Sequence, residues 1–120
     1  MDIKDSWTPG RRNSFITAVL RSGSRRWPPR YTCLANAKTE KKINIKTGRL
    51  AQHYMCASCN KETVAKDVQV DHIQPIVDPN MGFESWDKFI ERLFCDIDNL
   101  QVLCIACHKT KTLSEKKKKK

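Results

Sequence analysis

The stretch Val68-Gln69-Val70-Asp71-His72-Ile73 decides the fold that the sequence predicts. Its apolar and polar residues alternate, which indicates a short β-strand, and it ends in an adjacent carboxylate and imidazole. One Asp and one His are too few ligands to hold a metal ion, so partners must come from elsewhere in the chain. The best candidates lie in the segment 99–108, NLQVLCIACH. We therefore expect the rest of the chain to bring these two stretches together.

The chain has 120 residues, which suits one domain better than two. Six cysteines could stabilise so small a core, either as disulfides or as metal ligands, and the cellular compartment distinguishes the two. The N-terminus has no apolar run typical of a signal peptide, and no stretch approaches transmembrane length. We expect a cytoplasmic protein, in the host cytoplasm if it is encoded by a phage. Its thiols are then reduced, which favours zinc over disulfide bridges.

The net charge of +10 is unevenly distributed. Residues 1–70 carry 14 Lys and Arg against 5 Asp and Glu, residues 71–98 carry 2 against 7, and residues 99–120 carry 7 against 1. Two basic blocks around an acidic insert are typical of a protein whose ends face a polyanion, although a basic surface also serves solubility. Membrane binding usually needs a basic amphipathic helix with exposed apolar anchors. We therefore predict nucleic acid as the partner and no membrane.

The first quarter of the chain predicts a basic helix followed by an extended arm. Thr8 can cap a helix from Pro9 to Arg21, and the segment 22–24, SGS, ends it. Residues 25–30 are expected to be extended, because the residue before a proline is pushed out of the helical region. Arginine meets phosphate through a planar fork, and three arginines of the arm are predicted to bind DNA. They are Arg25, Arg26 and Arg30.

Trp27 and the arginines around it have a structural interpretation as well as a binding one. Trp27 can stack on a base, or it can pin a loop to the core while the arginines form a solvated face. Residues 33–42 predict a short helix, and residues 43–54 predict a hairpin with a glycine turn. For the lone His53 we predict a structural or surface role rather than a role as a ligand.

The second half predicts an amphipathic helix, a short strand and a final helix. Apolar residues recur at helical spacing after Ser85 and are expected to face the core. The strand is predicted over residues 100–103 and the helix over residues 105–115. The tail, residues 116–120, is predicted to be disordered, either as an electrostatic tether to DNA or as a frayed end. The apolar stripe consists of Trp86, Phe89, Ile90, Leu93 and Phe94.

Two C-x-x-C motifs, Cys56–Cys59 and Cys104–Cys107, predict one tetrahedral four-cysteine zinc site. The interval between them exceeds that of an ordinary zinc ribbon, so a whole unit with the Asp-His strand must be looped out. A four-thiolate site has no open position, so we assign this zinc to structure; disulfides or redox thiols are the alternatives. The two remaining cysteines, Cys33 and Cys95, are predicted to be buried free thiols, with a disulfide bond between them as the alternative.

These residues together resemble the HNH endonucleases, also called ββα-metal nucleases, and in particular small zinc-knuckle members of tailed phages. The resemblance covers residues 56–113, and residues 15–29 look, less distinctively, like the N-terminal part of some phage members. It implies an α+β fold: a small zinc-stabilised ββα-metal core, residues 56–115, after an N-terminal basic helix and hairpin region, residues 1–55. The matching motifs are Cys56-x-x-Cys59, Val70-Asp71-His72-Ile73-x-Pro75, Asn99-Leu100-x-x-Leu103-Cys104-x-x-Cys107-His108 and Lys109-x-x-Thr112.

The resemblance implies a role for each polar residue of the motif. His72 would be the general base, because an imidazole can accept a proton from water near neutral pH. Asp71 and His108 would hold one divalent ion, Mg²⁺ or Mn²⁺, that polarises the scissile phosphate. Asn99 would brace the loop between the strands and so orient the base, without acting as a ligand. The products would carry a 5′-phosphate and a 3′-hydroxyl. The sequence leaves nicking and double-strand cutting both open, and a monomer with one site would most simply nick.

Two expectations concern the geometry around this motif. Adjacent residues of a regular strand point to opposite faces, so we expect the strand to end or twist at Asp71-His72. Lys109 and Lys111, near the start of the last helix, are predicted either to contact DNA phosphate or to be ordinary solvated lysines. The alternative function is a non-catalytic zinc module that binds nucleic acid; a zinc-stabilised protein-interaction domain is less favoured. Neither alternative needs Asp71, His72 and His108 together.

Overall fold

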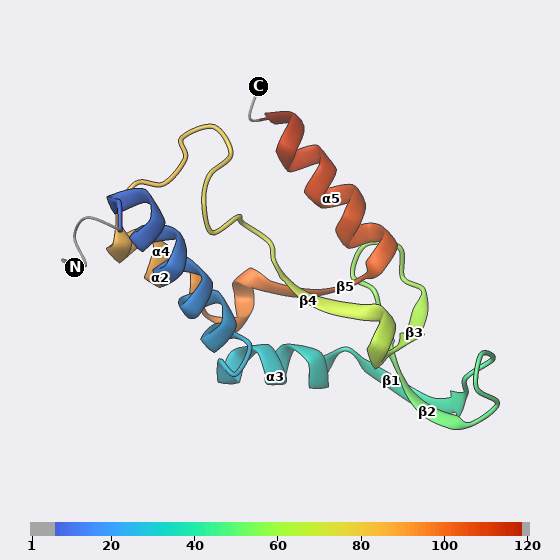
Figure 1. The fold of residues 1–120 in the computed structure, drawn as a ribbon. Coiled ribbons are helices and arrows are strands. Elements are labelled where there is room, and N and C mark those ends of the chain that lie inside the picture. The colour runs from blue at the N-terminus through green and yellow to red at the C-terminus, as the bar shows by residue number, and fades with distance from the viewer. Residues whose placement is uncertain (1–6, 119–120) are drawn as a thin grey trace.

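A computed structural model describes residues 7–118 of the chain (Figure 1). Helices α2 and α4 pack at one end, a β-hairpin projects at the other, and a two-stranded sheet with its following helix lies between them. The chain is α+β, as predicted. No helix within the described residues is long and apolar enough to cross a membrane. In chain order the elements are α2 (Pro9–Ser24), α3 (Pro28–Asn36), β1 (Lys38–Ile43), β2 (Leu50–Met55), β3 (Glu62–Val64), β4 (Val68–His72), α4 (Trp86–Leu93), β5 (Leu100–Cys104) and α5 (Ile105–Lys118), with short 3₁₀ turns at Ala65–Asp67 and Ile97–Asn99.

Helix α2 begins as predicted but continues to Ser24, three residues beyond the predicted end at Arg21, and the segment after it is not an extended arm. The hydroxyl of Thr8 accepts a hydrogen bond from the N–H of Arg11 at 3.2 Å, which caps the helix. Only Trp27 is extended, with φ −64° and ψ 120°, and α3 begins at Pro28. Proline suits the first turn of a helix because its N–H would have no partner there. Arg25 is also helical, with φ −60° and ψ −24°, so the predicted extended conformation is wrong both there and at residues 28–30.

The hairpin is confirmed, but its first strand lies earlier in the sequence than predicted. Residues 38–42, expected to be helical, belong to β1, which pairs antiparallel with β2. The short strand β3, which was not predicted, pairs with the other edge of β2. Lys42 forms an ion pair with Glu62 on β3, and this contact favours the strand over the helical propensity of a lysine-rich segment. Gly48 has φ +72° and closes the turn between β1 and β2.

Strands β4 and β5 form a separate antiparallel pair in continuous register from Val68–Cys104 to His72–Leu100. Both strands were predicted, and α5 follows β5 without a loop. Helix α3 packs against this pair, and the first core cluster forms where they meet. Its buried members are Cys33, Tyr54, Val68, Leu100 and Val102.

A second core cluster lies between α4 and the loop after β4. Phe89 and Leu93 are buried in it with Ile76, while Trp86 and Phe94 are half-buried around them. The predicted apolar stripe of α4 is therefore largely confirmed. Ile90 is the exception, because 43% of it is exposed.

Helix α5 is longer than predicted. It continues to Lys118, whereas a disordered tail was expected from residue 116. Lysine has good helix propensity, and positive charge is favourable in the last turn of a helix. Residues 119–120 of the predicted tail lie outside the described residues.

Candidate metal centre and active site

The cysteines of the two C-x-x-C motifs converge at one point. Cys56 and Cys59 lie in the turn after β2, whereas Cys104 ends β5 and Cys107 lies in the first turn of α5. Their sulfur atoms all lie within 4.8 Å of one another, and Sγ of Cys59 is 3.8 Å from Sγ of Cys104. Zinc–sulfur bonds of about 2.3 Å in a tetrahedron place the sulfurs about 3.8 Å apart. The predicted convergence is confirmed, and the donor set is that of a zinc-type site.

Backbone contacts hold the first motif against the second. Asn60 adopts a positive φ of 61°, and its N–H donates to the carbonyl oxygen of Cys56 at 3.0 Å, which closes the turn. The N–H of Ala57 donates to the carbonyl oxygen of Val102 at 2.8 Å. This hydrogen bond holds the turn after β2 against β5 at Val102, two residues before Cys104.

Crowding gives the thiols very different acidities. Burial raises the pKa of Cys56, but hydrogen bonds from the backbone at Cys59, Cys104 and Ser58 outweigh it and lower the pKa to about 6. Hydrogen bonds with the thiols of Cys104 and Cys59 raise the pKa of Cys107 to about 12. Thiolates this close repel one another, so a cation is needed among them if all four are to be ionised at neutral pH.

The two remaining cysteines lie away from this cluster. Cys33 is buried in the first core cluster, and the half-buried Cys95 packs against it. Both are free thiols, as predicted. Burial raises the pKa of each thiol, which keeps both in the neutral form.

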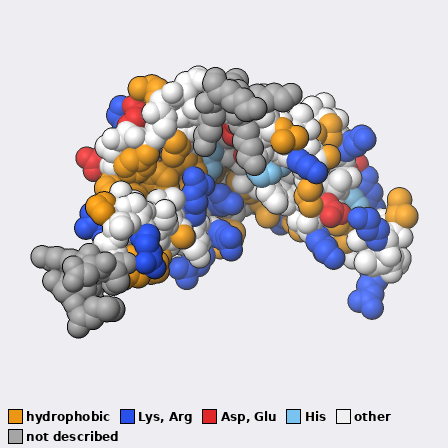
Figure 2. Space-filling model, turned by 45° about the horizontal axis from the view of Figure 1, so that its top comes forward, with side chains coloured by type: hydrophobic (Ala, Val, Ile, Leu, Met, Phe, Trp, Pro, Cys, Tyr) orange, Lys and Arg blue, Asp and Glu red, His pale blue; other side chains and the backbone are white. Residues whose placement is uncertain are grey.

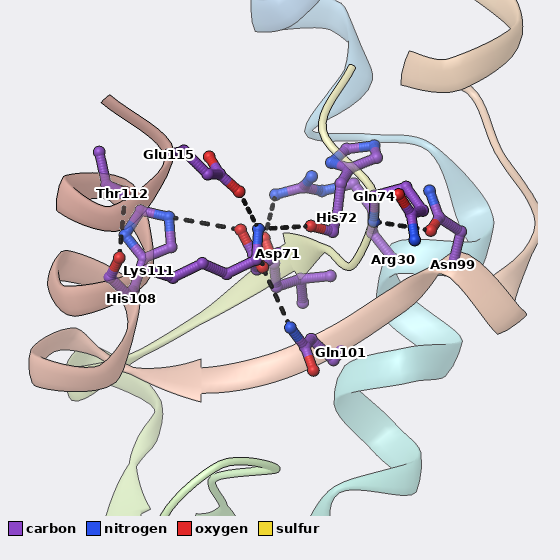
Figure 3. A network of polar contacts seen from close by, with 11 residues as sticks. Arg30, Asp71, His72, Gln74, Asn99, Gln101, His108, Lys111, Thr112 and Glu115 are labelled. Carbon is purple, nitrogen blue, oxygen red and sulfur yellow. Dashed lines mark hydrogen bonds and ion pairs between the residues drawn. The ribbon is translucent and has the colours of Figure 1, made fainter. Parts of the chain in front are cut away.

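Asp71 and His108 meet in front of the β4–β5 pair (Figure 3). Asp71 lies on β4 opposite Gln101, and His108 follows Cys107, so the cysteine motif fixes where the histidine lies. Oδ1 of Asp71 is 3.6 Å from Nε2 of His108. The other oxygen, Oδ2, accepts a hydrogen bond from Gln101 at 3.2 Å and lies 3.2 Å from Nζ of Lys111. The carboxylate therefore has one oxygen engaged and one facing the imidazole.

His72 is buried at the end of β4, only 8% exposed. Its Nε2 lies 3.0 Å from the backbone oxygen of Leu93. A carbonyl oxygen only accepts, so Nε2 carries the proton in the neutral ring and Nδ1 carries the lone pair. Burial lowers the pKa of His72, and the charges of Arg30 and Arg21 lower it further, against the opposing effects of the Leu93 carbonyl and Asp71. The imidazole is therefore neutral at neutral pH.

Asp71 and His72 contact different elements but line one cavity. The pairing of β4 persists through both residues and the strand ends at His72, as predicted. Asp71 faces α5, whereas His72 reaches toward the end of α4. The cavity of about 370 Å³ beside them adjoins a larger hollow of about 1080 Å³ between α5 and the loop after β4. The polar residues that line the smaller cavity are Arg21, Asp71, His72, His108, Lys111, Thr112 and Glu115.

Asn99 braces the chain directly after His72. Its backbone oxygen accepts a hydrogen bond from the N–H of Ile73 at 2.8 Å, and its Oδ1 accepts one from the N–H of Gln74 at 3.0 Å. The side-chain oxygen is thus engaged with the backbone of the loop. This geometry suits an orienting residue better than a metal ligand.

The arginines predicted to bind DNA occupy the turn between α2 and α3 and the start of α3. Arg25 and Arg26 are exposed in the turn. Arg30 is half-buried, and its Nη2 donates at 3.5 Å to the backbone oxygen of Val70, the residue that precedes Asp71. Of the three arginines, Arg30 therefore contacts the strand that carries Asp71, whereas Arg25 and Arg26 are exposed in the turn that precedes α3.

Trp27 pins a loop to the core, the structural one of its two interpretations. Its Nε1 donates to the backbone oxygen of Cys95 at 2.7 Å. Its ring packs edge-on against Phe94, with centroids 5.5 Å apart. These contacts tie the start of α3 to the end of α4, which is also where the partner of His72 lies.

Lys109 and Lys111 have different environments. Lys109 is exposed on α5, whereas Lys111 is half-buried in the candidate site. Nζ of Lys111 lies 3.2 Å from Oδ2 of Asp71, donates to the backbone oxygen of His72 at 2.9 Å and pairs with Glu115 (Figure 3). Burial alone lowers the pKa of Lys111, but the carboxylates of Glu115 and Asp71 outweigh it and hold the pKa above its usual value. Lys111 is thus not an ordinary solvated lysine.

Sequence reasoning missed three residues of this site: Gln101, Glu115 and Arg21. The spacing of His108, Lys111 and Glu115 by three and four residues does place them on one face of a helix, so a signal for Glu115 was present. Gln101 and Arg21 depend on strand register and on helix packing, which no local pattern specifies.

Comparison with protein-family models, curated proteins and solved structures found no match for this chain. The resemblance to HNH endonucleases therefore stays a prediction. Its support comes from the contacts of the candidate site itself.

Proposed function

We propose that the protein is a metal-dependent DNA endonuclease of the HNH class. The observation that carries this proposal is the 3.6 Å approach of Asp71 to His108, beside the buried and neutral His72. The three residues lie on two antiparallel strands and the helix that follows them, next to the four-cysteine cluster. A module that only binds nucleic acid has no need of this combination.

The donor set of Asp71 and His108 fits a divalent cation. Oδ1 and Nε2 face each other, and an oxygen–nitrogen pair suits Mg²⁺ or Mn²⁺ while tolerating softer ions. The ammonium group of Lys111 already lies against the same carboxylate, which indicates that this position favours positive charge. The chemistry that such an ion supplies when bound is polarisation of the scissile phosphate and neutralisation of the leaving 3′-oxygen.

His72 is the general base in this proposal. The Leu93 carbonyl holds the proton on Nε2, so Nδ1 is the atom that would take a proton from the attacking water. The lowered pKa keeps Nδ1 unprotonated at neutral pH. Asn99 fixes the chain just after His72 and so limits the orientations of the ring. Attack of water on phosphorus with departure of the 3′-oxygen leaves a 5′-phosphate and a 3′-hydroxyl.

The basic residues around the cavity would hold the DNA backbone. Arg25 and Arg26 lie exposed on one side, with Arg30 beside them, and Lys109 lies exposed on α5. The four-cysteine site would have a structural role. Its second motif immediately precedes His108, so bound zinc would hold this histidine in position. One such site in a monomer would nick one strand.

The test is relaxation of supercoiled plasmid by the purified full chain, with Mg²⁺, with Mn²⁺ and without added divalent ion. We expect nicked circles only with the ion, and nicks that DNA ligase reseals because they carry a 5′-phosphate and a 3′-hydroxyl. The metal content of the protein is measured in parallel, with zinc expected. DNA binding by the zinc-containing protein without nicking under any of these conditions would contradict the proposal and favour the non-catalytic binding module.

A further inference from the structure

The tip of the β1–β2 hairpin, residues 43–50, exposes every large apolar side chain that it carries. Ile45 is 97% exposed, Leu50 is 64% exposed and Ile43 is 57% exposed. Ile43 and Leu50 are cross-strand partners, and Ile45 lies beyond them in the turn. None of the three belongs to the core clusters found in residues 7–118. Burial in this fold therefore does not account for these side chains.

The turn is held in shape by its own hydrogen bonds. The N–H of Asn44 donates to the backbone oxygen of Arg49 at 2.8 Å, and the N–H of Gly48 donates to the backbone oxygen of Asn44 at 2.7 Å. Oδ1 of Asn44 accepts from the N–H of Lys46 at 3.1 Å. Ile45 is thus presented on a preformed turn, which lowers the entropic cost of using it in binding.

Positive charge surrounds this apolar tip. Residues 38–50 contain five Lys and Arg against one Glu. Lys42 pairs with Glu62, and Lys46 lies 3.9 Å from Asp67 but keeps 80% of its side chain exposed. Arg49 is exposed and has no carboxylate partner among the described residues. Figure 2 shows blue side chains over the arm on the right of the molecule, where the hairpin projects in Figure 1.

We propose that this tip is a second DNA-binding element, which inserts Ile45 into the minor groove of a duplex while Lys46 and Arg49 contact the flanking phosphates. An aliphatic wedge between cationic side chains is the means by which minor-groove proteins unstack a base step and bend DNA. A wedge needs a base stack to open, so the substrate is double-stranded rather than single-stranded. Duplex DNA accounts for the exposed aliphatic side chain and for the cations beside it together, whereas a membrane would require a larger apolar face.

The inference rests on the proposed function only in taking DNA as the ligand. The tip shares no residue with the candidate active site, so binding by the tip and cleavage are separable. The test therefore measures binding and bending in the absence of added Mg²⁺ or Mn²⁺. It uses the full chain and a short A·T-rich duplex labelled at its two ends for energy transfer, with the unlabelled single strand as competitor.

Three variants separate the wedge from the charges. Ile45→Ser removes the wedge, Lys46→Gln with Arg49→Gln removes the two charges, and Met81→Ser is the matched control because Met81 is also an exposed apolar residue, outside the hairpin. Thermal unfolding of each variant checks that the fold is retained.

We expect the wild-type chain and Met81→Ser to bend the duplex equally. Ile45→Ser should lose the bending signal and the preference for duplex over single strand, with duplex binding weakened on the order of tenfold and an unchanged salt dependence. The salt dependence of the double variant should be weaker: the negative slope of log K against log salt should become less steep by about two.

Equal bending and binding by Ile45→Ser and the wild-type chain would overturn the inference. So would Ile45-dependent binding to phosphatidylserine vesicles without any bending of DNA. Nicking without bending would contradict this inference alone, whereas bending without nicking would contradict the proposed nuclease function alone.

Discussion

Lys111 holds its ammonium group 3.2 Å from Oδ2 of Asp71, on the side of the carboxylate away from the 3.6 Å contact with His108. The same ammonium group donates to the backbone oxygen of His72 and pairs with Glu115. One lysine therefore touches the proposed metal ligand and the backbone of the proposed base. A divalent ion held by Asp71 and His108 would therefore share the carboxylate of Asp71 with this ammonium group.

Removing that charge should strengthen metal binding. We expect Lys111→Gln to lower the Mn²⁺ dissociation constant on the order of tenfold, because an ammonium group and a divalent ion repel each other across one carboxylate. Titration calorimetry with the full chain measures this constant. Lys109→Gln is the matched control, since Lys109 is exposed on the same helix. If Lys111→Gln binds Mn²⁺ as tightly as the wild-type chain or more weakly, the lysine and the ion do not share Asp71.

Gln101 should matter through the orientation of Asp71. Gln101→Leu removes the 3.2 Å hydrogen bond to Oδ2, and a hydrogen bond to a charged group contributes about 1.5–3 kcal/mol. We expect the Mn²⁺ concentration for half-maximal nicking to rise about tenfold or more. Gln69→Leu on β4 is the control, because Gln69 is exposed on the strand that carries Asp71. The same activation curve for both variants would exclude a positioning role for Gln101.

Loss of zinc should remove both stability and activity. Cys56→Ser takes one sulfur from the cluster that fastens the turn after β2 to the start of α5. Binding of structural zinc contributes on the order of 10 kcal/mol to the folding of small zinc domains. We expect bound zinc, thermal stability and nicking to fall together. Cys33→Ala, at a buried thiol outside the cluster, should keep its zinc and its activity; zinc loss in that variant, or full zinc in Cys56→Ser, would contradict the four-cysteine assignment.

Protonation of His72 should destabilise the fold in mild acid. Burial lowers the pKa of His72 below its usual value of 6.5, so the unfolded chain binds this proton more readily than the folded one. The contribution of the neutral ring to stability is complete above pH 6.5 and decreases as the pH falls through that value. The free energy of unfolding in urea should therefore fall with pH more steeply for the wild-type chain than for His72→Gln. The difference in slope is at most about 1.4 kcal/mol per pH unit, the limit for one proton.

Acid also releases zinc, and this effect should be equal in both proteins. Parallel slopes for the wild-type chain and His72→Gln between pH 7.5 and 5.5 would mean that the histidine does not resist protonation in the folded state.

The central unit of the fold could be predicted because its signals are local. Alternation specified β4, helical periodicity specified α4, and two C-x-x-C motifs at the ends of the looped-out unit specified the cysteine cluster. Long-range pairing decided the rest. Residues 38–42 have helix-forming side chains, but pairing with β2 and the ion pair to Glu62 place them in a strand.

The candidate site was predictable to a similar extent. The approach of Asp71 to His108 was expected from the resemblance to the HNH motif. The contacts of Oδ2 with Gln101 and Lys111 instead depend on the pairing register of β4 with β5 and on which face of α5 points toward Asp71. Trp27 illustrates the same limit: only tertiary packing shows that its N–H is bound to the Cys95 carbonyl.

The most direct test of the proposed mechanism compares two equally buried histidines. His72 and His53 are each 8% exposed, and each has a ring nitrogen within about 3 Å of a backbone carbonyl, but only His72 lines the cavity with Asp71 and His108. Supercoiled plasmid is incubated with Mn²⁺ and the wild-type chain, His72→Gln or His53→Gln, with zinc content and thermal stability measured for each protein. The proposal predicts that His72→Gln loses nicking by a factor of about 100 or more, while His53→Gln retains it. Nicking by a folded, zinc-containing His72→Gln protein at the wild-type rate would contradict it.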